Sequence, residues 1–322
     1  MTGPSAPQPA FATAIGHGIH VIDTGFHRPF FDAAYLIVER GHAAFVDAGT
    51  NHSVPRLLAA LAATGLDVGA VDYVIATHVH LDHAGGVGLL MQALPSARLV
   101  AHPRGARHLA DPTHLIKGAT AVYGADEIER SYGILVPVAA ERIVETSDGA
   151  TIELAGRPLL FLDTPGHAMH HHCIWDVASR GFFTGDTFGI SYRDFDTEAG
   201  PWIMPTTTPV QFQPEALQRS IERILAYDPE RIYVTHYGSV GDVPRLGALL
   251  LAQLDEMVAV ARAARPGADR HAALMRGLEA VHLGRLRAHG VTLSDQHIHE
   301  LLALDLELNA QGIAIWLDRT AA

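Results

Sequence analysis

Four side chains that can bind a metal ion lie within six residues of one another: His78, His80, Asp82 and His83. They directly follow the apolar run 71–76, which predicts a buried strand. Side chains at positions i and i+2 of an extended segment share a face, so His78 and His80 can bind one ion. Asp82 and His83 come after the chain begins to turn, so they can point at a second ion. This spacing predicts a metal centre.

Three more residues of the same chemical types also follow predicted strands closely: His167, Asp186 and His236. Strands are expected at 159–163, 181–184 and 231–234. Strand ends on one edge of a sheet open into one crevice, and we therefore expect these residues to share a site with His78.

The elements that must position these residues form two sets. Strands are expected at 19–23, 34–38, 43–47, 71–76 and 98–101, with helices at 55–63 and 87–93 between them. After an irregular insertion at 103–140, a second set of mainly antiparallel strands begins near 142. This order of elements predicts a layered arrangement of helices and sheets.

Helices dominate the remainder of the chain, at about 243–264, 269–289 and 294–309, while the apolar run 313–317 has no assignment. We predict a flexible tail at 1–14, a catalytic domain at 15–242 and a C-terminal α-helical extension at 243–322. The extension can be a cap on the sheet layers, a wall of a substrate pocket, or the surface of a homodimer.

Composition limits the partners and the compartment. The 322 residues are 48% hydrophobic and carry a formal charge of −12, which disfavours a nucleic-acid partner. Cys173 is the only cysteine, so an internal disulfide is excluded and a reducing compartment fits. We see neither a signal peptide nor an apolar run that could cross a membrane, so we expect a cytoplasmic protein without membrane association.

The signature His78-x-His80-x-Asp82-His83, followed by His167, Asp186 and His236, resembles the metallo-β-lactamase fold superfamily over about residues 17–240. The resemblance implies the α+β class and a four-layer αββα sandwich, with metals at one edge of the sheets. It also implies a division of the ligands. His78, His80 and His167 would bind the first ion, Asp82, His83 and His236 would bind the second, and Asp186 would bridge the two.

Within that superfamily the ligand set resembles glyoxalase II-like thioesterases and acyl-homoserine lactonases. All seven donors are nitrogen or oxygen, which suits two divalent ions, with Zn²⁺ first and Fe or Mn as alternatives. The expected reaction is attack by a bridging hydroxide on the carbonyl carbon of a small thioester, lactone or ester. Lys117 is the only lysine, and we find none of the basic residues that grip glutathione in glyoxalase II.

Asp82 and three further residues receive candidate roles in this hydrolysis. Asp82 could pass a proton to the leaving group, and Tyr192 and Tyr237 could donate a hydrogen bond to the developing oxyanion. Asp47 is either a turn residue or a hydrogen-bond acceptor that orients a ligating histidine. Of the run 170–172, strand alternation would send His171 away from the site and leave at most one neighbour near it.

Two other activities remain open on the same scaffold. One is an iron-dependent oxidoreductase, either like persulfide dioxygenase or with a diiron centre. The other is a phosphodiesterase, against which the acidic charge and the missing basic stripe count.

Overall fold

The computed structural model describes residues 9–207, 210–264, 266–267 and 269–321. Two compact units divide the chain. The first unit comprises Met1–Asp163, His170–Gly185 and Arg231–Ser239, and the second comprises Thr164–Met169, Asp186–Glu230 and Val240–Ala322. The boundary predicted between residues 242 and 243 stays a prediction. Each unit is described by itself below.

The larger sheet of the first unit holds seven strands of the described chain, in the order β1 to β7. Their bounds are β1 Ala12–Gly16, β2 Ile19–Asp23, β3 Ala33–Glu39, β4 His42–Val46, β5 Val71–Ile75, β6 Arg98–Ala101 and β7 Ile143–Glu145. Strands β1 to β4 pair antiparallel, and β4 to β7 pair parallel. The parallel strands therefore end at one edge of the sheet, where the predicted metal motif follows β5.

A second sheet has the order β13-β12-β11-β10-β9-β8. Its strands are β8 Thr151–Leu154, β9 Arg157–Asp163, β10 His172–Asp176, β11 Gly181–Gly185, β12 Arg231–Val234 and β13 Ser239–Val240. Strands β8 to β11 pair antiparallel, whereas β11 and β12 pair parallel. The parallel pair brings the carboxyl end of β12, which precedes His236, to the same end as that of β11.

Alternation along the strands builds two apolar layers in the first unit. Leu36 of β3 and its cross-strand partner Phe45 of β4 pack into a cluster with the helices. The neighbouring Tyr35 and Val46 instead pack with Phe161 and other residues of the second sheet. Successive side chains of a strand point to opposite faces, so one sheet can separate a helical layer from a sheet–sheet core.

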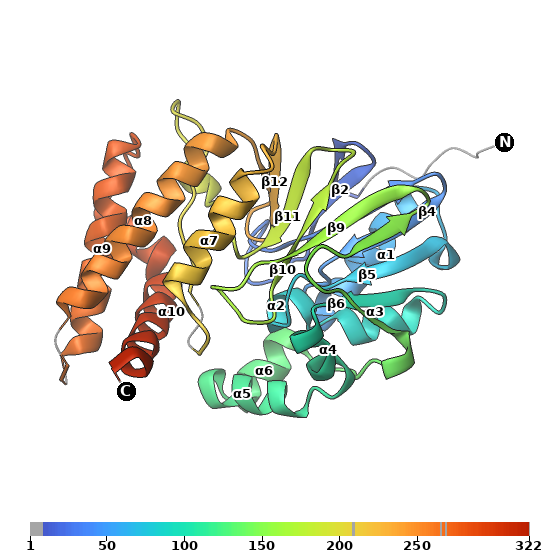
Figure 1. Cartoon of the computed structure of the whole chain (residues 1–322), viewed down its shortest axis with the longest axis horizontal. Helices are drawn as coiled ribbons and strands as arrows, with labels where there is room; N and C mark the ends of the chain where they lie inside the picture. Colours follow the sequence, from blue (N-terminus) through green and yellow to red (C-terminus); the bar gives the residue numbers. More distant parts are fainter. Residues whose placement is uncertain (1–8, 208–209, 265, 268, 322) are drawn as a thin grey trace. The chain divides into compact units, whose positions relative to one another are not determined.

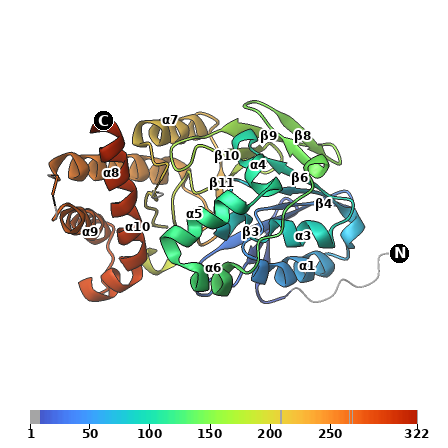
Figure 2. The same ribbon diagram turned by 90° about the horizontal axis from the view of Figure 1, so that it is seen from below.

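The helical layer of the first unit contains α1 Val54–Ala63, α3 Val87–Ala93 and α4 Pro103–Ala110, which contribute to the cluster around Phe45. Figure 2 shows α1 and α3 side by side, with β4 above them in that view. The short α2 Leu81–Ala84 lies within the predicted metal motif, and α5 Thr113–Tyr123 and α6 Ala125–Tyr132 occupy the insertion. The predicted α+β class and the stacking of two sheets, with helices against the larger one, are confirmed.

The second unit is mainly helical, with α7 Pro214–Leu225, α8 Val243–Ala263, α9 Arg270–Ala288 and α10 Asp295–Ala321. Figure 1 shows α8, α9 and α10 beside one another. The predicted helices at 243–264 and 269–289 are confirmed. The third is longer than predicted, because it continues through the apolar run 313–317. No helix among the described residues is long and apolar enough to cross a membrane.

The first strand begins earlier than the sequence suggested. Residues 12–14 were expected in the flexible tail but belong to β1, where Ala12 pairs with Ile22 and Ala14 with His20. Ala12 is buried in the helical-side core, which favours the strand although its polar–apolar alternation is weak. Residues 1–8 of the predicted tail lie outside the described part of the chain.

Candidate metal centre

The predicted metal motif lies where β5 ends and α2 begins. Main-chain hydrogen bonds join α2 to the turn after β4: Ala48 N donates to His83 O, and Gly86 N donates to Gly49 O, both at 2.8 Å. A Cβ at Gly86 would lie 2.8 Å from the Ala48 oxygen, so only glycine allows this close approach. The turn thus fixes the start of α2 against the end of β4.

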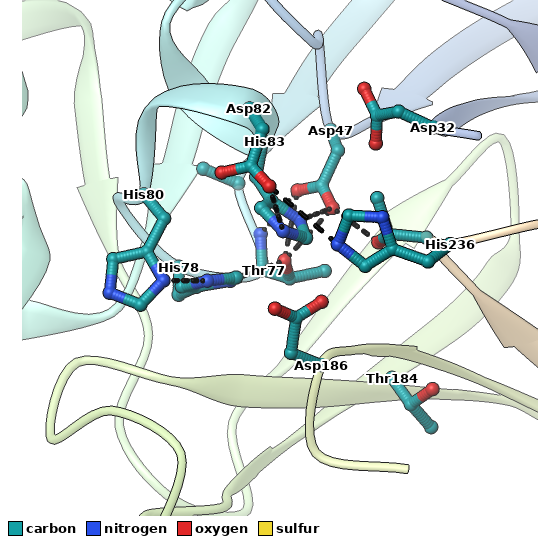
Figure 3. Close-up of polar contacts among 12 residues, drawn as sticks. Asp32, Asp47, Thr77, His78, His80, Asp82, His83, Thr184, Asp186 and His236 are labelled. Carbon is teal, nitrogen blue, oxygen red and sulfur yellow. Dashed lines mark hydrogen bonds and ion pairs between the residues drawn. The ribbon is translucent and has the colours of Figure 1, made fainter. Parts of the chain in front are cut away.

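One group of three ligand-type residues lies within the first unit: Asp82, His83 and His236. Their ligand atoms all lie within 4.8 Å of one another. Oδ2 of Asp82 is 3.5 Å from Nε2 of His83 and 3.6 Å from Nε2 of His236. Figure 3 shows the three side chains turned toward one another. Both histidines are buried. These distances bring together three residues that the resemblance assigned to one ion.

The opposite nitrogens of these two histidines contact oxygen acceptors. Nδ1 of His236 is 3.2 Å from the main-chain oxygen of Phe31, and Nδ1 of His83 is 3.0 Å from Oδ2 of Asp47. A carbonyl or carboxylate oxygen can only accept, so Nδ1 carries the proton in each ring. The lone pair is then on Nε2, which faces Asp82, as ligation of a metal requires.

Asp47 connects three strand ends through its carboxylate. It is buried after β4 with φ of +59°, and it accepts from Thr77 N at 2.8 Å and from Thr235 Oγ1 at 3.2 Å. Thr77 Oγ1 also donates to it, at 2.9 Å. Asp47 would need such contacts, above all the one with His83, to orient a ligating histidine as predicted.

The pair His78 and His80 forms a second group in the first unit. Nε2 of His78 is 2.7 Å from Nδ1 of His80, as expected for residues two apart in an extended segment (Figure 3). Nδ1 of His78 is 3.2 Å from Thr77 Oγ1, whose own proton goes to Asp47. The Thr77 hydroxyl therefore accepts from His78, which gives His78 the same tautomer as His83 and His236.

The second unit holds the other two predicted ligands, His167 and Asp186. Nε2 of His167 is 3.3 Å from Oδ2 of Asp186, and both side chains are buried. Nδ1 of His167 is 3.4 Å from the main-chain oxygen of Thr206, so this ring too presents its Nε2 lone pair to a carboxylate. A Cβ at Gly166, where φ is +136°, would lie 2.2 Å from Leu217 N of α7, so glycine allows the preceding turn.

The histidine run 170–172 differs from its prediction. The His171 ring stacks on His78, with centroids 4.8 Å apart, although alternation was expected to send it away. The alternation argument fails because β10 begins only at His172. His172 instead lies at 2.8 Å from the Ala76 oxygen and 3.1 Å from Thr146 Oγ1, and burial lowers its pKa to about 3.

The two tyrosines proposed as oxyanion donors have different surroundings. Tyr192 is buried, and its hydroxyl donates to Oδ2 of Asp305 and lies 3.2 Å from the Leu301 oxygen in α10. Its single proton is therefore directed to α10, which corrects its assignment as an oxyanion donor. The Tyr237 oxygen accepts from Arg28, and its role as an oxyanion donor stays a prediction.

Asp32 is a residue that sequence reasoning missed. Its carboxyl is fully buried and accepts from Thr24 Oγ1 at 2.8 Å, and Figure 3 shows it near Asp47 and His236. Burial raises its pKa to about 7, against the opposing effect of His236 and His83. In the sequence, Asp32 is a lone aspartate before a strand, and no spacing indicates that it is buried near His236.

Known proteins resemble this chain in both sequence and structure. The chain is 27% identical over 213 residues to the metallo-beta-lactamase fold-containing protein ST1585 of Sulfurisphaera tokodaii, which covers 64% of this chain and 74% of that protein. The crystal structure of ST1585 matches with a TM-score of 0.62 at 24% identity, over 85% of this chain and 99% of that one. The latter match is evidence for the fold alone.

Two relatives carry the names of hydrolytic enzymes. The hydroxyacylglutathione hydrolase of Cupriavidus taiwanensis is 33% identical over 170 residues, 49% of this chain and 50% of that protein. The atrochrysone carboxyl ACP thioesterase of Aspergillus fumigatus is 26% identical over 154 residues, 48% of this chain and 38% of that protein. The family model of the metallo-beta-lactamase superfamily matches residues 27–236. With this match and the grouped histidines and aspartates, the chain belongs to the metallo-β-lactamase superfamily.

Proposed function

We propose that this protein is a dinuclear metal-dependent hydrolase that acts on the carbonyl carbon of a small thioester, ester or lactone. The observation that carries the proposal is a shared ring orientation. His83, His236 and His167 each have Nδ1 beside an oxygen acceptor and Nε2 beside a carboxylate oxygen of Asp82 or Asp186. Histidine ligands of metals have this orientation as a rule.

The proposed ligand set follows the family pattern. His78, His80 and His167 would hold one divalent ion, Asp82, His83 and His236 the other, and Asp186 would serve both. All donors are imidazole nitrogen or carboxylate oxygen, a set that suits Zn²⁺ and also iron or manganese. Divalent ions bound there would supply Lewis acidity, which polarises a carbonyl group and lowers the pKa of water.

The chain's own residues would keep that site in one geometry. Asp47 holds His83 directly and His78 through Thr77, so one carboxylate orients a ligand of each proposed ion. Its contact with Thr235 also ties the chain just before His236 to the same carboxylate. Fixed rings lose less conformational entropy when they bind a metal, which favours a preorganised centre.

The substrate class is supported by chemistry and by relatives. Two relatives are named as a hydrolase and a thioesterase, which favours an acyl substrate. The formal charge of −12 and a single lysine, Lys117, disfavour a phosphodiester in a nucleic acid. We therefore rank small acyl compounds above phosphodiesters.

The experiment combines metal analysis with a hydrolysis screen. The purified chain is analysed for metals, and a chelated sample is reloaded with zinc, manganese or iron. Each sample is then tested on a thioester, a lactone, an aryl ester and a phosphodiester. We expect about two ions per chain and metal-dependent cleavage of at least one acyl compound. Oxygen consumption by an iron-loaded sample without acyl cleavage would instead favour the oxidoreductase, and phosphodiester cleavage alone would overturn the substrate class.

A further inference from the structure

The loop between β2 and β3 lies against the chain around His236. Its two ends are joined where Thr24 N donates to Asp32 O at 2.9 Å. Phe31 O receives Nδ1 of His236 at 3.2 Å, and the two rings lie 5.0 Å apart. Ala33 N donates to Thr235 O at 2.8 Å. The loop is therefore joined to the chain around His236 by main-chain hydrogen bonds and by a ring contact.

The backbone of this region carries conformations that non-glycine residues avoid. His27 has φ of +53°, Phe30 of +60° and Tyr237 of +72°. Phe30 is also 58% exposed, so burial of its ring does not account for the conformation. Such conformations are unfavourable for residues that carry a side chain, and they concentrate where a site must present particular side chains.

Arg28 lies at the centre of the loop, over two aromatic rings. Its guanidinium carbon is 5.5 Å from the ring centre of Phe31 and 5.4 Å from that of Tyr237. These rings meet edge to face with centroids 5.5 Å apart, and Arg28 donates to the Tyr237 hydroxyl. Arg28 is half-buried, and these contacts hold its guanidinium beside the two rings.

The neighbouring His27 relates the loop to Asp82 as well. Burial lowers the pKa of His27, and the carboxylates of Glu127 and Asp82 oppose that change. Arg28 contacts Tyr237, which directly follows His236, so the loop places a cation next to a residue that the resemblance assigned to the second ion.

We propose that Arg28 and Tyr237 bind an anionic group of the substrate, so that the preferred substrates are acyl compounds bearing a carboxylate. This inference rests on the proposed function. A guanidinium has five N–H donors in a planar fork, so it can contact the Tyr237 oxygen and a carboxylate together. The chain has 35 acidic and 23 basic residues, and a fixed cation at the site would counter the repulsion that an anionic substrate otherwise meets.

A simple packing role for Arg28 makes a different prediction. A guanidinium that only stacks on Phe31 and Tyr237 would stabilise the loop, and its loss would affect all substrates alike. A substrate-binding role predicts a loss confined to anionic substrates. The two roles are therefore separated by comparing substrates rather than by activity alone.

The test uses the metal-loaded chain and two thioesters of similar size, the anion acetylthioacetate and the neutral S-propyl thioacetate. We expect Arg28→Gln to lower the ratio of kcat/KM for the anion to that for the neutral compound by about 10- to 100-fold, mainly through KM. Arg28→Lys keeps the charge without the fork, so a smaller loss is expected. Arg40→Gln is the matched control, because Arg40 is exposed and pairs with Glu39.

Direct binding supplies a second readout. Titration with succinate, measured by calorimetry, should give about 10-fold weaker binding in Arg28→Gln and no change in Arg40→Gln. Equal losses for both thioesters, or unchanged succinate affinity, would overturn the inference. If the wild-type chain cleaves neither thioester, the proposed activity on these compounds fails, whereas the succinate titration still decides whether Arg28 binds anions.

Discussion

The His167 ring has its Nδ1 3.4 Å from the main-chain oxygen of Thr206. The next residue, Thr207, donates its N–H to Oδ1 of Asn309 in α10 at 2.8 Å. Asn309 is fully buried in the second unit. A residue of the C-terminal helix is thereby connected to a proposed metal ligand through only two consecutive residues of the intervening chain. The C-terminal helices are more than a cover in this unit, because one of them fixes the acceptor of His167.

Replacing Asn309 should loosen the hold on His167. Asn309→Leu removes the acceptor of Thr207 N, which costs on the order of 1–3 kcal/mol when the donor stays buried. We expect the affinity for the ion that His167 would bind to fall several-fold, measured by competition with a chelator. Gln311→Leu on the same helix is the control, because the Gln311 side chain donates to Glu307, one turn away on α10. Equal chelator curves for the wild-type chain and Asn309→Leu would refute the link to His167.

Asp47→Asn should lower the affinity for both proposed ions at once. The amide can still accept from Thr77, but its NH₂ group placed at His83 Nδ1 would set donor against donor. Changes of this kind to the partner of a ligating histidine cost about 10- to 100-fold in metal affinity. Calorimetric titration of the chelated chain with zinc measures the loss.

The matched control is Asp67→Asn, because Asp67 caps an exposed turn by accepting from Gly69 N. Should Asp47→Asn bind zinc as tightly as the wild-type chain, the orienting role of Asp47 would have to be abandoned.

The proposed ligands were predictable because each depends on local information. His78 and His80 share a face through spacing alone, and His167, Asp186 and His236 come soon after strands that their own sequences predict. His171 was misjudged because the prediction extended β10 by one residue, and a shift of one residue reverses the face of a side chain.

Contacts between distant segments could not be predicted in the same way. Arg28 and Tyr237 are 209 residues apart, and their contact depends on how the loop before β3 folds over the segment after β12. Tyr192 was predicted to be an oxyanion donor, yet its hydroxyl reaches Asp305, 113 residues away. No periodicity or spacing in either segment indicates which partner it finds.

Stability should depend on pH through His282 of α9. The imidazole is fully buried with Nδ1 3.3 Å from Gln253 Oε1, and burial lowers its pKa from 6.5 to about 4. A lowered pKa in the folded state means that the stabilisation is complete above pH 6.5 and is lost as the pH falls through about 4. The difference corresponds to about 3 kcal/mol in the free energy of unfolding.

We expect His282→Gln to flatten the pH dependence of that free energy between pH 6.5 and 4, measured by denaturant unfolding of the metal-free chain. His271→Gln is the control, because His271 is exposed on the same helix and pairs with Glu307. If both variants keep the wild-type slope, His282 does not titrate as the burial argument requires.

Asp186 tests whether the two proposed ions act as a pair. Asp186→Ala removes the carboxylate beside His167 Nε2, and we expect metal content to fall and cleavage of a responsive thioester to drop by about 100-fold or more. Metal analysis and kcat are measured on the same preparation, with Asp194→Ala as the control because Asp194 is exposed in the same loop. If one ion were enough for hydrolysis, the variant without the shared carboxylate would keep its activity. Full hydrolysis with half the metal would therefore exclude a mechanism that needs both ions.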